Sequence, residues 1–259
     1  MKSWLRHLLP FGLVRAVQWA DEFGRIGLAR RHALRRNAPY QLQALNLSLL
    51  PDNALAGPPA CIVDVGANTG DWAAGLLAYY APARLVCIEP DPHLAAGLRT
   101  RFAATPAVSV IESAAGAEHG TCLLQLMEDR AFNSLRPPVA ATQADYPATF
   151  RVRETRSVRL APLDDLLADL PRIRLLKIDV QGSEREVLQG AAAVLRRTDF
   201  VLLEVNFKAH YQGEAGIGEL LALLGGHGFA LGSYSPPRGG RREALYADAL
   251  FLRTGAPAT

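Results

Sequence analysis

Residues 62–72 read IVDVGANTGDW, and this stretch decides the fold. It starts as a short apolar run that carries the acid Asp64, and it then turns through Gly66 and Gly70. Glycine permits unusual backbone angles and a close approach of the backbone to a ligand. A helix is expected to begin near Asp71, which is a plausible cap. The stretch therefore predicts a buried strand, a ligand-binding turn and a helix.

The turn does not match the known phosphate-binding loops. A dinucleotide-binding turn needs three glycines, and Asn68 stands where the middle glycine would be. A P-loop needs Lys-Ser or Lys-Thr after its second glycine, and neither pair follows Gly70. An acid before the turn favours a cation or an amine over a phosphate. These features predict a nucleoside ligand that carries positive charge and no phosphate.

Beyond this stretch, apolar strand-like runs alternate with helical segments. Strands are expected at 61–65, 85–90, 108–116, 121–127, 175–180, 200–207, 229–234 and 244–253, the last two antiparallel. Helices are expected at 71–80, 93–102, 163–170, 184–195 and 217–224, whereas 128–157 should be irregular. Such alternation is typical of an α/β protein with a doubly wound, mostly parallel sheet and helices on both faces. We expect seven strands in that sheet.

Residues 1–56 are predicted to be a basic helical N-terminal extension and linker, and residues 57–259 the main domain. The net charge is only +3, but residues 1–36 hold eight Lys or Arg against two Asp or Glu. Apolar residues at helical spacing indicate a helix over 11–36. We favour a helix packed on the body, and the alternative is a peripheral helix on anionic lipid. The apolar run is too short for a membrane span, so a cytoplasmic location is expected, with contact to the inner face of a membrane left open.

Composition excludes several other classes of function. With 49% apolar and 20% charged residues, the chain is typical of a globular protein. Cys61, Cys87 and Cys122 show no metal-ligand spacing, which favours free thiols and gives almost no support to zinc. The main domain carries no stripe of basic residues interleaved with aromatic residues, so a nucleic-acid partner is not expected.

The residues that directly follow the strands are the candidate site, because ligands bind beyond the carboxyl ends of the strands in such sheets. Glu89 ends the second strand about 20 residues after the turn, where an acid accepts hydrogen bonds from both hydroxyls of a ribose. Asp179 and Glu204 end two later strands. Together with the turn, Glu89 makes nucleoside binding the better interpretation.

These segments also resemble the motifs of a known family. VDVGANTGDW and IEPDP look like the first two motifs of class I methyltransferases, which have a Rossmann-like fold. LKIDVQGSEREVLQGA at 176–191 and VLLEVNF at 201–207 are similar to the FkbM family of S-adenosylmethionine-dependent O-methyltransferases. The resemblance covers nearly the whole main domain and does not include the N-terminal extension.

The resemblance implies S-adenosylmethionine as the cofactor and assigns residues to it. The turn residues would line its amino-acid and sulfonium end, Glu89 its ribose, the residues after the third strand its adenine, and Asp179 the transferred methyl. The implied cofactor-binding residues are Asp64, Gly66, Asn68, Gly70, Glu89, Asp91, Ser113, Ala114 and Asp179.

Methyl transfer to a hydroxyl is helped by a base within hydrogen-bond reach of that hydroxyl. Asp179 is the first candidate, Glu204 could act with it, and His210 is an alternative in the following loop. Glu184 either satisfies the start of its helix or belongs to the site, and Lys177 is expected to be a paired lysine in the sheet. The carboxylates could instead hold Mg²⁺, but we favour a site without metal.

The family precedent implies a hydroxyl of a sugar, glycan or related small molecule as the acceptor. Residues 128–157 are expected to form a lid or acceptor wall, whose arginines suit a sugar with phosphate or carboxylate nearby. The alternative from a different class is a non-catalytic nucleoside-binding scaffold in a glycan-synthesis complex. A dehydrogenase is disfavoured by the missing glycines of the turn.

Overall fold

The computed structural model describes residues 47, 49–51, 54–55, 60–77, 80–239 and 244–255. The predicted helix over 11–36 lies outside the described residues, and the division into an extension and a main domain stays a prediction. Leu47, Leu50 and Leu55 are buried against the same apolar cluster as Trp72, so the described part of 47–55 packs on the body.

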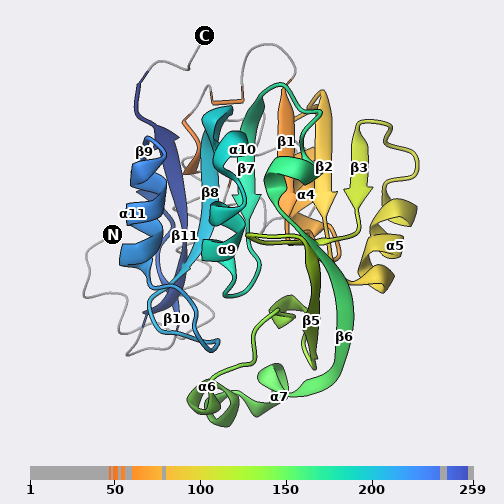
Figure 1. Ribbon diagram of the computed structural model, residues 1–259, viewed down its shortest axis with the longest axis vertical. Coiled ribbons are helices and arrows are strands. Elements are labelled where there is room, and N and C mark those ends of the chain that lie inside the picture. Colours follow the sequence, from red (N-terminus) through yellow and green to blue (C-terminus); the bar gives the residue numbers. More distant parts are fainter. Residues whose placement is uncertain are drawn as a thin grey trace, which may run out of the picture.

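A mostly parallel sheet forms the centre of the protein (Figure 1). Its strands run in the order β3-β2-β1-β7-β8-β11, and β9 and the two-residue β10 both pair antiparallel with β11. The strands are β1 (Cys61–Val65), β2 (Arg84–Ile88), β3 (Val108–Ile111), β7 (Ile173–Ile178), β8 (Thr198–Asn206), β9 (Phe229–Tyr234), β10 (Arg238–Gly239) and β11 (Ala244–Arg253). The strand order reverses between β1 and β7, which makes this the point where such sheets bind ligands. The predicted doubly wound sheet is confirmed. The short strand β10 is present in addition to the seven expected strands.

Helices cover both faces of this sheet. On the face toward the viewer in Figure 1, apolar side chains of the sheet pack against α8 (Leu163–Leu166), α9 (Glu184–Gln189), α10 (Ala192–Arg196) and α11 (Ile217–Gly226). The other face packs against α4 (Asp71–Leu77) and α5 (Pro92–Arg101), where Leu76 and Leu98 are buried. Each fully buried leucine contributes about 1.5–3 kcal/mol relative to an exposed one, so the two clusters hold the strand ends rigidly.

A second, three-stranded sheet departs from the prediction. It consists of β4 (Ala114–Ala115), β6 (Val152–Ala161) and β5 (Gly120–Met127), in that order. The segment between β5 and β6 contains the short 3₁₀ helix η4 (Arg130–Phe132), α6 (Ala140–Asp145) and α7 (Pro147–Phe150). In Figure 1 this sheet reaches below the main sheet, with α6 and α7 near its tip. The predicted strand over 108–116 is therefore two strands in two sheets, and 152–157 is a strand and not irregular.

The helix predicted over 184–195 is also divided, into α9 and α10. A Cβ on Gly190 would lie 1.9 Å from the carbonyl oxygen of Gly116, so the chain needs glycine at this close approach. The carboxylate of Asp164 accepts hydrogen bonds from the backbone N–H groups of Ala193 and Val194 at 2.9 and 2.7 Å. Because these amides belong to the first turn of α10, Asp164 starts a new helix there.

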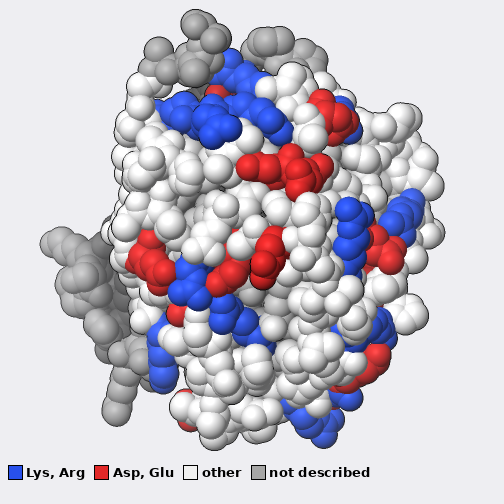
Figure 2. All heavy atoms as spheres, in the orientation of Figure 1, with Lys and Arg blue, Asp and Glu red and all other residues white. Residues whose placement is uncertain are grey.

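Acidic and basic side chains are interspersed on the face of the molecule shown in Figure 2. Many of the charged side chains form exposed ion pairs, such as Arg151 with Glu128 at 2.8 Å and Arg185 with Glu219 at 3.2 Å. Exposed pairs of this kind contribute at most about 1 kcal/mol each. Within the part of the chain that the structure describes, no helix is both long and apolar enough to cross a membrane.

Candidate active site

The turn between β1 and α4 is held against the ends of two neighbouring strands. Gly66 has a φ of +81° and Asn68 a φ of +49°. The backbone N–H groups of Gly66 and Ala67 donate to the carbonyl oxygen of Ile88 at 3.0 and 3.1 Å. A Cβ on Gly66 would lie 1.9 Å from the carbonyl oxygen of Asp179. Glycine is therefore required here because the turn packs on the segment that follows β7.

Glu89 lies at the end of β2 with a carboxylate prepared for a ligand. It is 5% exposed, and its two oxygens accept hydrogen bonds from the backbone N–H groups of Asn68 (2.8 Å) and Asp91 (2.9 Å). A carboxylate has about four acceptor positions, so each oxygen can accept one further donor. Burial raises the pKa of Glu89 to about 7, although the two N–H groups oppose this shift. The geometry fits a pair of ribose hydroxyls.

A cleft of about 610 Å³ opens beside this turn. Its volume lies in the usual range for small-molecule sites, about 300–1,000 Å³. The lining comes from the segments after β1, β2, β3 and β7 and from residues 128–135. Six of the predicted residues line it, namely Gly66, Asn68, Glu89, Ser113, Ala114 and Asp179. The structure thus brings these six residues together around one cleft at the switch point of the sheet.

Asp64, by contrast, lies behind the cleft. It is fully buried and accepts a hydrogen bond from Lys177 Nζ at 2.9 Å, because the two residues are partners on β1 and β7. Lys177 Nζ also lies 3.5 Å from Asp179 Oδ2 and lines the cleft. Burial alone would lower the pKa of Lys177, but the carboxylates of Asp64 and Asp179 outweigh it and raise that pKa. The expected pairing of Lys177 is present, and Asp64 serves this lysine instead of lining the cleft.

Gly70 and Asp91, two further predicted cofactor-binding residues, do not line the cleft. A Cβ on Gly70 would lie 2.6 Å from a methyl group of Leu98, so this glycine allows α5 to pack closely. The carboxylate of Asp91 caps α5 through the N–H of His93 and pairs with Arg156, both at 2.9 Å. Both residues support the positions of the lining residues and of Glu89.

A second cavity of about 270 Å³ adjoins the cleft. All three predicted catalytic residues, Asp179, Glu204 and His210, line it. Ala131, Asp179 and Gln181 line both the cleft and the cavity. A group held in the cleft can therefore face a second molecule in the cavity across Asp179.

Gln181, which the sequence analysis did not single out, joins the two carboxylates. Its Nε2 donates to Asp179 Oδ1 at 2.9 Å and to Glu204 Oε1 at 3.0 Å. Its Oε1 accepts a hydrogen bond from the hydroxyl of Tyr211 at 2.9 Å. Because carboxylate oxygens accept hydrogen bonds, the two acids turn the NH₂ end of Gln181 toward themselves, and its oxygen end then faces the Tyr211 hydroxyl. The only signal in the sequence was the place of Gln181 inside the KIDVQG string.

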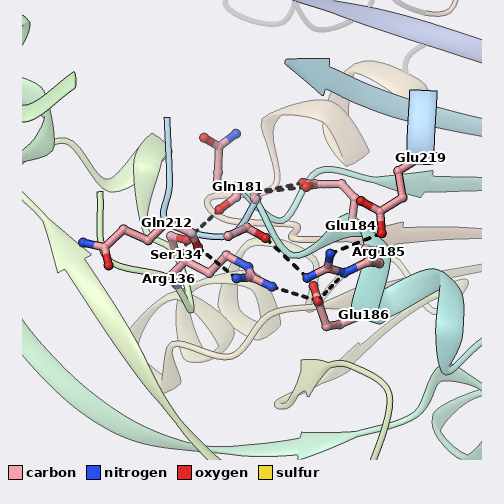
Figure 3. Close-up of polar contacts among 10 residues, drawn as sticks. Ser134, Arg136, Gln181, Glu184, Arg185, Glu186, Gln212 and Glu219 are labelled. Atoms are coloured by element: carbon pink, nitrogen blue, oxygen red, sulfur yellow. Dashed lines mark hydrogen bonds and ion pairs between the residues drawn. The ribbon is translucent and has the colours of Figure 1, made fainter. Parts of the chain in front are cut away.

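The backbone of Gln181 is held in an unusual conformation by its neighbours. Its φ of +57° lies in the left-handed region, which residues other than glycine seldom adopt. Ser134 Oγ donates to the carbonyl oxygen of Gln181 at 2.6 Å and accepts from the backbone N–H of Arg136 at 3.0 Å. Figure 3 shows how the Arg136 guanidinium then binds Glu186 of α9 at 2.7 Å and the carbonyl of Gln212 at 2.8 Å. Such strain persists where the surroundings over-determine it, and it clusters at active sites.

Burial raises the pKa of two further acids in this region. It raises the pKa of Glu204 well above its ordinary value, and the nearby carboxylates of Asp179 and Asp248 raise it further. Burial also raises the pKa of Glu184 to about 7. Glu184 accepts from the N–H groups of Val180 and Gly182 at 3.1–3.2 Å and lines neither the cleft nor the cavity. Glu184 therefore satisfies the backbone of the turn that leads from β7 into α9.

The described residues contain no group of His, Cys, Asp and Glu side chains arranged to hold a metal ion. Cys61 and Cys87 are buried free thiols, and Cys122 is a half-buried one. The arrangement instead offers a nucleoside cleft with an acid for the ribose, and a carboxylate pair that can take a proton from a hydroxyl in the adjoining cavity.

A switch-point cleft, a buried acid at the end of β2 and an antiparallel β11 beside β8 are features of the class I methyltransferase fold. Residues 64–231 match the family model described as the Methyltransferase FkbM domain. Because this match covers more than half of the chain, the protein belongs to the FkbM methyltransferase family. The predicted family and the predicted enzyme class, an S-adenosylmethionine-dependent methyltransferase, are confirmed.

The relatives agree with this family. The chain is 28% identical over 179 residues to the 2-O-methyltransferase NoeI of Sinorhizobium fredii (strain NBRC 101917 / NGR234), a match that covers 66% of this chain and 73% of NoeI. It is 39% identical over 97 residues to the 31-O-demethyl-FK506 methyltransferase FkbM of Streptomyces tacrolimicus, which covers 36% of this chain and 34% of that protein. Among solved structures, methyltransferase FkbM from Methylobacillus flagellatus KT matches 93% of this chain and 60% of its own, with 17% identity and a TM-score of 0.49.

Proposed function

We propose that the protein transfers a methyl group from S-adenosylmethionine to a hydroxyl of a sugar, a glycan or a related small molecule. The observation that carries this proposal is the second cavity, which adjoins the cleft, shares Asp179 with it and is also lined by Glu204. The names of NoeI and FkbM describe both relatives as methyltransferases that act at an oxygen, which supports an oxygen acceptor here.

The residues of the cleft fit the cofactor. Glu89 would accept the ribose hydroxyls, and Ser113 and Ala114 would lie beside the adenine. Gly66 and Asn68 would line the amino-acid end, which leaves the sulfonium near Asp179. When bound, the cofactor supplies a methyl group that is electrophilic because it is attached to positively charged sulfur.

The acceptor oxygen would take the methyl group as the carbon–sulfur bond breaks, and the electron pair of that bond would stay on sulfur. The hydroxyl proton would pass to a carboxylate of this chain. Much of the barrier is met by holding the two groups in line. Asp179 is the proposed base, because it alone of the predicted carboxylates lines both the cleft and the cavity.

Glu204 and His210 have narrower roles in this proposal. Glu204 shares the Gln181 amide with Asp179 and is placed to receive the proton next. The ring of His210 stacks on Phe150 with 5.8 Å between the centroids, which makes His210 a wall of the cavity and a weaker alternative base. We do not propose a role for Mg²⁺, and full activity in excess chelator is expected.

The test is methyl transfer to a panel of hydroxylated sugars, followed as formation of S-adenosylhomocysteine and of methylated product. Asp179→Asn and Glu204→Gln should lower turnover by about 10²–10⁴-fold while S-adenosylhomocysteine still binds. Glu219→Gln is the control, because Glu219 lies in the exposed first turn of α11 and lines neither the cleft nor the cavity. Unchanged turnover in both variants would exclude the carboxylate pair as the base.

The same panel separates the alternative function. A scaffold without catalysis would bind S-adenosylhomocysteine and methylate none of the sugars. Transfer only to protein or nucleic acid would also contradict a sugar acceptor.

Residues 1–56 are proposed as a basic extension of a cytoplasmic enzyme, of which the described part of 47–55 packs on the body. Their excess of Lys and Arg supports contact with anionic lipid as an alternative to packing on the body. Liposome co-sedimentation of the full chain and of a chain without residues 1–46 decides between them, and equal pelleting of the two would contradict contact with lipid.

A further inference from the structure

The segment between β5 and β6 is paired with the loop that follows β8. The backbone N–H of Val139 donates to the carbonyl oxygen of His210, and the backbone N–H of Gln212 donates to the carbonyl oxygen of Pro137, both at 2.9 Å. Phe150 of the segment and His210 of the loop both line the second cavity. The pairing of the two stretches therefore sets the distance between these walls of the cavity.

Arg136 fastens this pairing with its side chain. Its Nη1 donates to the carbonyl oxygen of Gln212 in the loop at 2.8 Å, and its Nη2 donates to Glu186 Oε1 on α9 at 2.7 Å (Figure 3). Gly213 has a φ of +68°, and a Cβ there would lie 2.7 Å from Arg136 Nη1, so the loop leaves room for the guanidinium. Burial alone would raise the pKa of Glu186, but the hydrogen bonds from Arg136 and Arg185 outweigh it and lower that pKa. Arg136 thus binds an ionised carboxylate on a helix of the main domain.

The backbone of Arg136 reaches the centre of the site. Its N–H donates to Ser134 Oγ at 3.0 Å, and this hydroxyl donates to the carbonyl oxygen of Gln181 at 2.6 Å. The side chain of Gln181 in turn binds both Asp179 and Glu204. Because the φ of Gln181 is +57°, its conformation depends on such support from its surroundings.

Arg136 reaches no ligand site itself. The arginines of this part of the chain were expected to face an acceptor with phosphate or carboxylate nearby, but Arg136 lines neither the cleft nor the cavity. Its side chain is 20% exposed, and its guanidinium binds a carboxylate and a carbonyl of the protein. Any effect of Arg136 on the reaction therefore passes through the groups that it holds.

We propose that Arg136 is a positioning residue, which holds the wall of the acceptor cavity and the amide of Gln181 in the geometry that methyl transfer needs. A misplacement of about 1 Å that originates far from the reacting atoms can slow a reaction about a hundredfold. Glu89 and Gly66 belong to other segments of the chain, so the cofactor should bind equally well without Arg136. This inference rests on the proposed function, because it concerns the acceptor cavity of that reaction.

Arg136→Met tests the proposal, because it removes both hydrogen bonds of the guanidinium and keeps much of the length of the side chain. For the best acceptor of the sugar panel, kcat should fall by about tenfold to a hundredfold and KM should rise, whereas the Kd for S-adenosylhomocysteine stays that of the wild type. Arg136→Lys keeps the charge but lacks the planar fork that serves two partners, so its kcat should be intermediate. Wild-type kcat and KM in a folded Arg136→Met variant, or an equal loss of cofactor binding, would overturn the proposal. If that variant does not fold, Arg136→Lys decides by the same two criteria.

Arg172→Met is the matched control. Arg172 directly precedes β7 and pairs with Asp199 of β8 at 2.7 Å, the same distance that joins Arg136 to Glu186. It lies at the end of β7 opposite to Asp179 and lines neither the cleft nor the cavity. The variant loses an arginine–carboxylate pair but should keep the kcat and KM of the wild type. An equal loss of turnover in Arg172→Met would count against a specific role of Arg136.

Hydrogen exchange gives a readout that does not depend on the acceptor. With S-adenosylhomocysteine bound, the amides of Val139 and Gln212 should exchange faster in Arg136→Met than in the wild type, whereas those of β1 should not change. If the wild type methylates none of the sugars, the proposed function fails, and faster exchange at these two amides still supports the hold of Arg136 on the cavity wall. Unchanged exchange at both amides would overturn the proposal in either case.

Discussion

Replacing Glu89 by glutamine tests the cofactor site most directly. The substitution keeps the size of the side chain but removes its charge and one of its two acceptor oxygens. In the structure, these oxygens accept the N–H groups of Asn68 and Asp91, so one N–H would then face an NH₂ group. The variant should still fold, since Glu89 buries no large apolar surface, but it should bind S-adenosylhomocysteine weakly.

The size of the loss follows from the hydrogen bonds to the ribose. A hydrogen bond to a charged group is worth about 1.5–3 kcal/mol, and glutamine can accept from at most one of the two hydroxyls. We therefore expect the Kd for S-adenosylhomocysteine to rise by about tenfold to a hundredfold. Titration calorimetry of the wild type and the variant at constant salt measures this directly.

The dependence on pH gives a second and independent readout. The pKa of Glu89 lies at about 7 in the folded protein, above its ordinary value of 4.5. The stability that Glu89 contributes is therefore full below pH 4.5 and is lost as the pH rises through 7, by up to about 3 kcal/mol for such a shift. Because the ribose hydroxyls bind the ionised carboxylate, wild-type affinity should increase with pH up to about 7 and then level off. Glu89→Gln should lose this dependence.

Glu112→Gln is the matched control, because Glu112 also follows a strand of the sheet but forms an exposed pair with Arg99 at 2.9 Å and does not line the cleft. Its affinity and pH dependence should stay those of the wild type. Wild-type affinity in Glu89→Gln would refute the assignment of Glu89 to the ribose. A wild-type affinity that does not change between pH 5.5 and 8, around the pKa of about 7, would refute the role of its ionisation.

Three further predictions test the supports of the site. Lys177→Met should lower the free energy of unfolding by about 3–5 kcal/mol in a urea titration, because Asp64 is left buried without its partner. The double variant Asp64→Leu/Lys177→Met should recover most of this loss. An equal loss of stability in the single and the double variant would contradict the pairing. Gln181→Leu should lower kcat by about tenfold to a hundredfold with little change in S-adenosylhomocysteine binding, since it removes hydrogen bonds to two carboxylates, and Tyr211→Phe should have a smaller effect in the same assay. Gly66→Ala should lower the Tm markedly in a calorimetric scan, because its Cβ would lie 1.9 Å from a carbonyl oxygen, and a wild-type Tm would contradict that packing.

The central part of the fold and much of the cleft could be predicted because their signals are local. The turn at Gly66, the acid at the end of β2 and the order of strands and helices are each written within a short stretch of sequence. Once the sheet is known to be parallel, the ends of its strands must meet at one edge, which brings Glu89 and Asp179 to the same cleft.

The second sheet could not be predicted, because β6 lacks the apolar run that marked the other strands. Arg153 and Glu154 are exposed, and few of the ten residues of β6 are buried. Its pairing with β5 joins residues up to 40 positions apart, such as Gly120 and Leu160. A strand with one face in solvent and a distant partner gives little signal in its own sequence.

The contacts of individual side chains escaped prediction for a similar reason. Asp64 was expected in the cleft, but every residue of β1 is buried, so its sequence does not show which side each residue faces. Its partner Lys177 is 113 positions away. The bridging role of Gln181 likewise depends on Glu204 and Tyr211, which only the folded chain places beside it.

The excursion between β5 and β6 supplies one wall of the second cavity and part of the lining of the cleft. Phe132, Tyr146 and Phe150 all come from this one continuous segment, and it is tied to the body by contacts such as the Tyr211 hydroxyl to the carbonyl of Phe132 at 3.0 Å and Ser134 Oγ to the carbonyl of Gln181 at 2.6 Å. A change in this one segment therefore alters several walls of the second cavity at once, whereas Glu89 and Gly66 belong to other segments of the chain. The shape of that cavity can accordingly be redesigned within a single stretch of chain that leaves Glu89 in place.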